Sequence, residues 1–241
     1  MQGDHTGRTG RHWEHRPEPE WEDFTFNQPY ARGLNRLHNE VLDKTDFDPG
    51  TLFQWGTMQA MAIIGILKGV EARFGAEGQR VVLDALYAVG KDIGEQITEG
   101  TTIPESMSDA QWNSFYATII NRVAYASLES PEIVSDDNVN FHIDWCPHQD
   151  HYEAFDCRVQ RYFVQGMIDA ATEHAAKFGR AFSWDVTACS TIPSGAKTCF
   201  FDLTAGDPND SRVWGEYTKA LEARALSIVA VTDSSSSGRP A

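Results

Sequence analysis

Between Asn138 and Cys146 the side chains alternate in type, and this pattern restricts the segment to a β-strand with two different faces. Successive side chains of a strand point to opposite sides, so each parity of the sequence occupies one face. One parity is apolar and the other carries ionisable or nucleophilic groups: Phe141, Ile143 and Trp145 against His142, Asp144, Cys146 and, farther on, His148. We therefore predict a strand with an apolar underside and a row of reactive side chains above it.

The reactive row predicts a catalytic site. Neighbours on the same face of a strand lie about 6.5–7 Å apart, so one substrate, water or metal ion can bridge them. A thiol beside a histidine can act as a nucleophile, and a carboxylate beside an imidazole fixes its tautomer. We expect Cys146 to be the nucleophile, His142 or His148 the base, and Asp144 the orienting group. The alternative is a polar pair satisfied within the sheet, with Cys146 as a small buried hydrophobic residue.

Hydrophobic spacing predicts a helical half followed by a mixed half. Helices are expected at Asn35–Leu42, at Leu52–Arg73 ending with Phe74-Gly75, at Gly78–Glu99, and at Trp112–Ser127 after a capping box of Ser108 and Gln111. After Pro131 we expect the strand Asn138–Cys146, a helix Glu153–Phe178, a hairpin of Ala181–Cys189 and Lys197–Leu203 turning at Pro193-Ser194-Gly195, and a helix Asp210–Val229. This order predicts an α+β fold with an antiparallel sheet covered on one face.

The composition of the two ends predicts that they are disordered. Residues 1–22 are rich in Gly, His, Arg, Glu and Pro, and residues 232–241 contain a run of serines. Residues 23–231 are long enough for one domain with a real core, formed by a helical half (23–130) and a strand–helix–hairpin half (131–231).

The charge of the chain limits its partners. A net charge of −15 argues against nucleic acid and anionic lipid, and favours a small-molecule substrate. No segment is apolar enough to span a membrane or to serve as a signal peptide, so we expect a cytoplasmic protein with reduced cysteines. The four cysteines form no C-x-x-C pair, which argues against a structural zinc site. The apolar helix 52–70 either covers the sheet or pairs with its copy in a homodimer.

The helix predicted at Glu153–Phe178 carries a polar line formed by Gln165, Asp169 and Glu173 (or Thr172). Asp169 lies among small and apolar neighbours, where a carboxylate either faces solvent or is a working group with an altered pKa. The residues that we expect to contact substrate are Trp145, Tyr152, Tyr162, Gln165 and Thr191. If the protein only binds its ligand, Trp145, Tyr152, Tyr162 and Trp184 are expected to form an aromatic cage.

Residues 145–203 resemble the L-2-amino-thiazoline-4-carboxylic acid hydrolase family. The resemblance rests on Cys146-Pro147, Asp169, Thr191, Gly195 and Cys199-Phe200-Phe201, which follow the order and rough spacing of that family. The final hairpin is also similar to that of vinyl-reductase-type small-ligand domains. The resemblance implies a related fold and a small-molecule hydrolase. One position departs from the pattern, because Gly166 stands where the family has a cysteine three residues before the aspartate, and Cys157 is the candidate substitute.

These observations predict an enzyme that hydrolyses a C–N bond in a small cyclic amidine, thiazoline or amide. Asp169 is expected to bind a cationic amidine nitrogen or to act as the acid. The alternatives are a biosynthetic cyclase, lyase or isomerase that uses the same His and Asp residues, and a non-catalytic ligand-binding protein. We expect no cofactor; a catalytic divalent metal ion would require the strand to bend at Pro147 and bring His142, Asp144 and His148 together.

Overall fold

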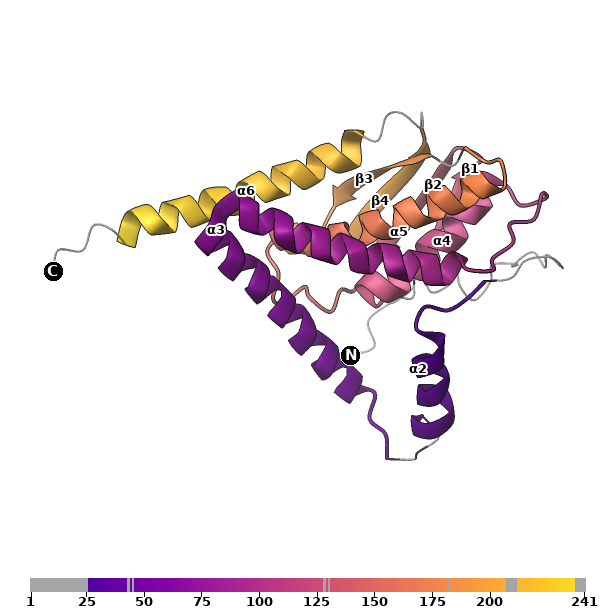
Figure 1. Ribbon diagram of the computed structural model, residues 1–241, viewed down its shortest axis with the longest axis horizontal. Helices are drawn as coiled ribbons and strands as arrows, with labels where there is room; N and C mark the ends of the chain where they lie inside the picture. The colour runs from indigo at the N-terminus through magenta and orange to yellow at the C-terminus, as the bar shows by residue number, and fades with distance from the viewer. Residues whose placement is uncertain are drawn as a thin grey trace.

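The computed structural model describes residues 26–42, 44, 46–127, 129, 131–181, 183–206 and 212–236, which form an α+β fold (Figure 1). The helices are α2 (Ala31–Arg36), α3 (Gly50–Thr98), α4 (Asp109–Tyr125), α5 (Arg158–Lys177) and α6 (Arg212–Ser236), with short turns of other helix types at η1 (Leu37–Val41), η2 (Ala154–Cys157) and η3 (Ile192–Ser194). The strands are β1 (Glu132–Ser135), β2 (Asn138–Ile143), β3 (Trp184–Ser190) and β4 (Cys199–Ala205). The predicted disordered segment 1–22 lies outside the described residues.

The four strands form one antiparallel sheet in the order β1-β2-β4-β3. Within β2 the predicted alternation is confirmed, because Val139, Phe141 and Ile143 are buried while the residues between them are only half-buried. The predicted hairpin is formed by β3 and β4, and Gly195 closes it with a φ of 94°. Such a left-handed backbone favours glycine. Strand β1 was not predicted, because four residues carry too little alternation to be recognised.

Helix α3 is a hairpin of two arms, which Figure 1 shows as a V. The break is at Gly75, whose φ of 58° and ψ of −139° lie outside the helical region. The first arm comprises residues 50–74 and the second arm residues 76–98. This confirms the predicted end of a helix at Phe74-Gly75, since glycine adopts that backbone conformation without steric cost.

Helix α5 packs on the second arm of α3 with almost no space between the two backbones. A Cβ atom on Gly166 would lie 2.3 Å from the Tyr87 carbonyl oxygen, and one on Gly90 would lie 2.0 Å from the Phe163 carbonyl oxygen. Neither position can hold a side chain unless the helices separate. The glycine at position 166, where the resemblance implies a cysteine, is therefore explained by this close contact of α3 with α5.

Other elements differ from the predictions mainly at their ends. The capping box of Ser108 and Gln111 is present at the start of α4, as predicted. The expected helix from Glu153 begins instead with the 3-10 turn η2 and becomes an α-helix at Arg158. Helix α6 continues through Ser236, so residues 232–236 are helical and the predicted disordered tail does not begin at 232. In the part of the chain that the structure describes, no helix is both long and apolar enough to cross a bilayer.

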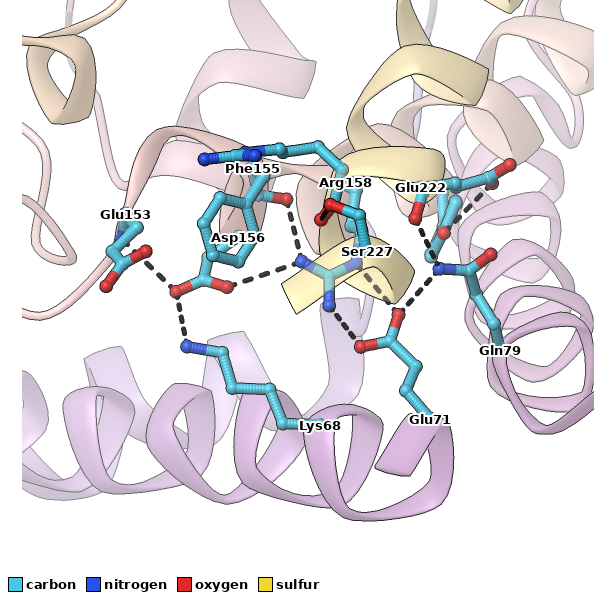
Figure 2. A network of polar contacts seen from close by, with 11 residues as sticks. Lys68, Glu71, Gln79, Glu153, Phe155, Asp156, Arg158, Glu222 and Ser227 are labelled. Carbon is cyan, nitrogen blue, oxygen red and sulfur yellow. Dashed lines mark hydrogen bonds and ion pairs between the residues drawn. The ribbon is translucent and has the colours of Figure 1, made fainter. Parts of the chain in front are cut away.

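A buried ion network joins the first arm of α3 to η2 and α5 (Figure 2). The Arg158 guanidinium donates to both carboxylate oxygens of Glu71, with Nη2 to Oε2 at 2.6 Å and Nε to Oε1 at 3.2 Å. It also donates from Nη1 to Oδ1 of Asp156 at 3.3 Å, and Lys68 Nζ reaches Oδ2 of the same carboxylate at 2.8 Å. The side chains of Arg158, Glu71 and Asp156 are at most 1% exposed.

The same network reaches α6. Gln79 Nε2 donates to Oε1 of Glu71 at 2.7 Å and to the Glu222 carbonyl at 3.2 Å. The Tyr162 hydroxyl donates to Oε1 of Glu222 at 3.0 Å. Polar groups on both arms of α3, on α5 and on α6 are thus satisfied by one another, as buried polar groups must be to avoid a large desolvation cost.

We predict that Glu71→Ala lowers the free energy of unfolding by about 3–5 kcal/mol, because it leaves the Arg158 guanidinium buried without its main partner. The double variant Glu71→Leu/Arg158→Met should lose much less, since no unpaired charge remains in the interior. Urea denaturation followed by circular dichroism measures both values. A loss below about 1 kcal/mol for Glu71→Ala would contradict a tightly buried ion pair.

Candidate functional site

The predicted row of reactive side chains does not form, because β2 ends at Ile143. Its ladder with β4 stops at the pair Ile143–Cys199, and beyond it the backbone N–H of Asp144 donates to the Glu129 carboxylate at 3.1 Å. Asp144 is exposed. His142 alone of the row lies on the outer face of the strand. The prediction that these residues share one face is therefore wrong, since the chain stops being extended where β4 no longer pairs with it.

His142 is held within the outer face of the sheet. Its ring stacks on that of its ladder partner Phe200 with centroids 4.5 Å apart, and its Nδ1 lies 3.1 Å from Thr198 Oγ1. Trp145, which was expected on the apolar underside of the strand and in the substrate site, is half exposed and packs against Phe53 of the first arm of α3. His142 thus packs on β4 and Trp145 on α3, while Asp144 is exposed.

The loop after β2 brings Cys146 and His148 together, as expected for a thiol and its base. Cys146 Sγ lies 3.7 Å from His148 Nδ1, and the Cys146 backbone N–H donates to Gln149 Oε1 at 3.2 Å. The His148 ring stacks on Tyr152 with centroids 4.7 Å apart. Cys146, His148 and Tyr152 are all buried.

A cavity of about 30 Å³ lies beside this pair. Its lining includes the three thiols Cys146, Cys157 and Cys199, together with the predicted substrate residue Thr191. Burial raises the pKa of all three thiols. The pKa of Cys157 rises to about 12 and that of Cys199 to about 11, and the pKa of Cys146 is also raised. The thiols are therefore protonated at neutral pH. Cys157 does lie beside Cys146, as a substitute for the missing helix cysteine would have to.

Burial and the nearby His151 lower the pKa of His148 to about 4, so near pH 7 its imidazole is neutral and the proton stays on the Cys146 thiol. Within the described residues, no group of three or more His, Cys, Asp and Glu side chains is arranged to hold a metal ion. The three predicted metal ligands His142, Asp144 and His148 are separated by the end of β2.

A larger cavity of about 250 Å³ lies between α4, α5 and the inner face of the sheet. Most of its wall is apolar and aromatic, with Tyr116, Tyr125, Phe141, Trp184 and Phe201 among the rings. Its volume exceeds the roughly 150 Å³ of a protein cavity that accepts benzene. Tyr125 and Phe201, with ring centroids 6.2 Å apart, line both cavities and therefore divide the larger one from the three thiols.

Two buried asparagines of α4 belong to the wall of the larger cavity. Asn113 and Asn121 are 6% and 0% exposed, and both line it. Among the described residues, neither Asn113 Nδ2 nor Asn121 Oδ1 has a hydrogen-bond partner. Leaving a buried donor or acceptor unsatisfied costs about 1–3 kcal/mol, and a ligand that reached either atom would recover that cost.

Asp169 and Gln165 lie at a half-buried edge of the same cavity, as the polar line on their helix predicted. Asp169 accepts hydrogen bonds from the Tyr87 hydroxyl and from Gln165 Nε2, each at 2.7 Å. The bond to Asp169 is the largest cause that raises the pKa of Tyr87 to about 12. An ionised carboxylate has about four acceptor positions, so Asp169 can accept further hydrogen bonds.

The structure divides the remaining predicted site residues among three places. Gln165 and Asp169 line the larger cavity, and Tyr152 and Thr191 line the smaller one with Cys146 and His148. Tyr162 lies in a second core cluster between α3 and α5 and lines neither cavity. Of the expected aromatic cage, Trp184 alone reaches the larger cavity. The asparagines were missed; the available signal was two amides within an otherwise buried helix.

No family model matches the chain. Over 216 residues it is 47% identical to an uncharacterized protein of Archaeoglobus fulgidus, and the aligned part covers 89% of this chain and 95% of the archaeal protein. Identity at this level over nearly the full length of both proteins shows that the chain belongs to the same family as the archaeal protein.

The depressed pKa of His148 predicts a loss of stability in acid. Its value of about 4 in the folded state lies below the ordinary 6.5, so the unfolded chain binds more protons between these pH values. The free energy of unfolding should therefore fall as the pH drops from 6.5 to 4, by about 1–3 kcal/mol from this group.

Urea denaturation at several pH values measures this dependence. His148→Gln should remove most of it, whereas His38→Gln, a change at an exposed position, should leave it unchanged. An equally steep pH dependence in His148→Gln and in the native chain would contradict the assignment to His148.

Proposed function

We propose that the family of this chain binds a small organic molecule in the cavity between α4, α5 and the sheet. The observation that carries the proposal is the pair of unsatisfied amide atoms of Asn113 and Asn121 on an apolar, ring-lined wall. A cavity that served packing alone would be filled by side chains or lined by apolar groups only. Apolar walls with a few placed polar groups are typical of ligand sites.

The lining indicates the chemistry of the ligand. The aromatic walls fit a flat ring or a compact apolar body, and a volume of about 250 Å³ limits it to a small molecule. The amide atoms favour a ligand with both a donor and an acceptor. Asp169 and Gln165 at the edge add acceptors for an amidine or amine nitrogen, which is the chemistry of the thiazolines and cyclic amidines that the sequence resemblance implies. The partners of the chain in this proposal are that small molecule and a second copy of the chain.

Benzamidine and benzamide are matched probes of this site, since they differ only in the group presented to Asp169. We expect both to bind, with benzamidine at least tenfold tighter because its cation faces the carboxylate. Asp169→Asn should abolish the difference between the two. Isothermal titration calorimetry measures all four affinities.

Ala117→Leu provides the structural control, because Ala117 is buried on the cavity wall. Filling the space should raise the free energy of unfolding by about 0.5–2 kcal/mol and eliminate binding of both probes. Unchanged binding by Ala117→Leu would show that the probes bind elsewhere.

A second candidate function is hydrolysis of a C–N bond by Cys146, and the observation that favours it is the 3.7 Å contact of Sγ with His148 Nδ1. In this mechanism His148 takes the thiol proton while Sγ attacks the amidine carbon. The proton then passes to the leaving nitrogen as the C–N bond breaks, and water releases the product from sulfur. The smaller cavity has no room for a thiazoline, so the substrate would sit in the larger cavity and Tyr125 and Phe201 would have to move.

The hydrolase proposal predicts turnover of 2-amino-thiazoline-4-carboxylate by the native chain, followed as loss of substrate by chromatography. Cys146→Ser and His148→Gln should each lower the rate by more than a hundredfold while the circular dichroism spectrum stays native. Cys189→Ser, at the exposed cysteine, is the matched control and should retain full activity. Full activity in Cys146→Ser would eliminate the covalent mechanism.

A further inference from the structure

One face of the first arm of α3 is apolar and exposed over most of its length. The residues of this exposed stripe are Trp55, Met58, Ala62, Gly65, Gly69 and Ala72, which follow one another at alternating intervals of three and four. The opposite face of the arm, with Ala60, Ile64 and Leu67, is buried in the chain itself. The spacing of the stripe is that of the contact positions of a coiled coil.

The exposed stripe presents large apolar side chains to solvent. Trp55 is 62% exposed and Met58 57%, and Ile66 at the margin of the stripe is 60% exposed. Contiguous exposed apolar surface of more than a few hundred Å² is rare on monomeric proteins and marks an interaction surface. These side chains do not contribute to the core of the chain. Contact with a partner would explain why they are apolar.

The two glycines of the stripe give independent support. A Cβ atom on Gly65 or Gly69 would meet no atom of the chain within 4 Å, in contrast to Gly90 and Gly166, which backbone atoms crowd. Each glycine inside a helix costs about 1 kcal/mol relative to alanine. The packing of the chain itself does not require glycine at positions 65 and 69. Glycine is required there if the backbone of a second helix approaches closely, because it has no side chain in the way.

We propose that the exposed stripe pairs antiparallel with the stripe of a second copy across a two-fold axis. Pairing the contact positions in antiparallel order sets Trp55 opposite the partner's Ala72 and Met58 opposite the partner's Gly69. Small residues meet at the centre, where Ala62 faces Gly65 of the partner subunit. Each large side chain thus meets a small one, and the surface is complementary to itself, as a two-fold interface requires.

The low charge of the first arm permits a second copy as the partner. The chain carries a net charge of −15, so two copies repel each other over most of their surfaces. Residues 50–70 contain one charged side chain, Lys68, and Asp156 of the same chain binds it.

The first arm is also long enough for an interface. Residues 50–74 extend for about 37 Å at about 1.5 Å per residue. With the exposed flanking residues Leu52, Met61 and Ile66, the arm offers roughly several hundred Å² per copy, toward the roughly 800 Å² per partner of a specific interface.

Sedimentation equilibrium of the full chain tests the proposal without reference to the ligand cavity. The native chain should have twice the mass of one chain at micromolar concentration. Met58→Glu should raise the dimer dissociation constant more than a hundredfold, whereas Val81→Glu should not change it. Val81 is 64% exposed on the second arm of α3 and is therefore the matched control. A native chain that remains monomeric at 50 µM would overturn the proposal. If Met58→Glu then also lowers the melting temperature of that monomer, the stripe is covered by the chain itself and not by a second copy.

A pair of variants tests the register. Gly69→Leu should weaken the dimer at least tenfold even though leucine favours the helix, because it collides with the partner's Met58. Adding Met58→Ala should restore the dimer, since the small residue accepts the new leucine. A dimer that Gly69→Leu leaves intact, or that Met58→Ala fails to restore, would overturn the antiparallel pairing. Because neither outcome depends on benzamidine binding, failure of this proposal is distinguishable from failure of the cavity proposal.

Discussion

The buried Arg158–Glu71 ion pair is the interaction on which the arrangement of the helices depends. Two charges enter the interior only when they bind each other and further polar groups, and here Asp156, Lys68 and Gln79 provide them. The network fixes the first arm of α3 against the start of α5. The network also holds η2, and η2 ends the loop that begins at Cys146 and His148. The contact between Cys146 and His148 therefore depends on charged residues about ten positions farther along the chain.

Helix α5 has two contrasting sides, and their difference defines the cavity. On one side Gly166 lies against the backbone of the second arm of α3, with no room even for a methyl group. On the other side Val164, Ile168 and Thr172 face a cavity of about 250 Å³ beneath the sheet. Because α5 packs this closely on α3, we would expect side chains to fill the space on its other side as well. That Asn113 Nδ2 and Asn121 Oδ1 in the cavity wall instead lack hydrogen-bond partners among the described residues is the main support for a ligand.

Sequence periodicity predicted the helices, the break at Gly75, the hairpin and the buried parity of β2, because local backbone preference and burial decide these features. It also predicted that Asp169 is a polar group on an otherwise apolar helix. It failed for the reactive row, since the end of β2 is set by where β4 begins, at a position 56 residues away from Ile143. Asn113 and Asn121 are visible in the sequence as two amides on an apolar helix, but their missing hydrogen-bond partners are a property of the folded chain and could not be predicted.

The most direct test of the ligand cavity is a crystal structure of the chain soaked with 4-bromobenzamidine, in which the anomalous signal of bromine locates the probe. A bromine peak between Tyr116, Phe141 and Trp184, with the amidine directed toward Asp169, is the result that the proposed function predicts. A cavity that stays empty in crystals at a saturating concentration, or a probe bound only outside it, would contradict the central claim that this space is a ligand site.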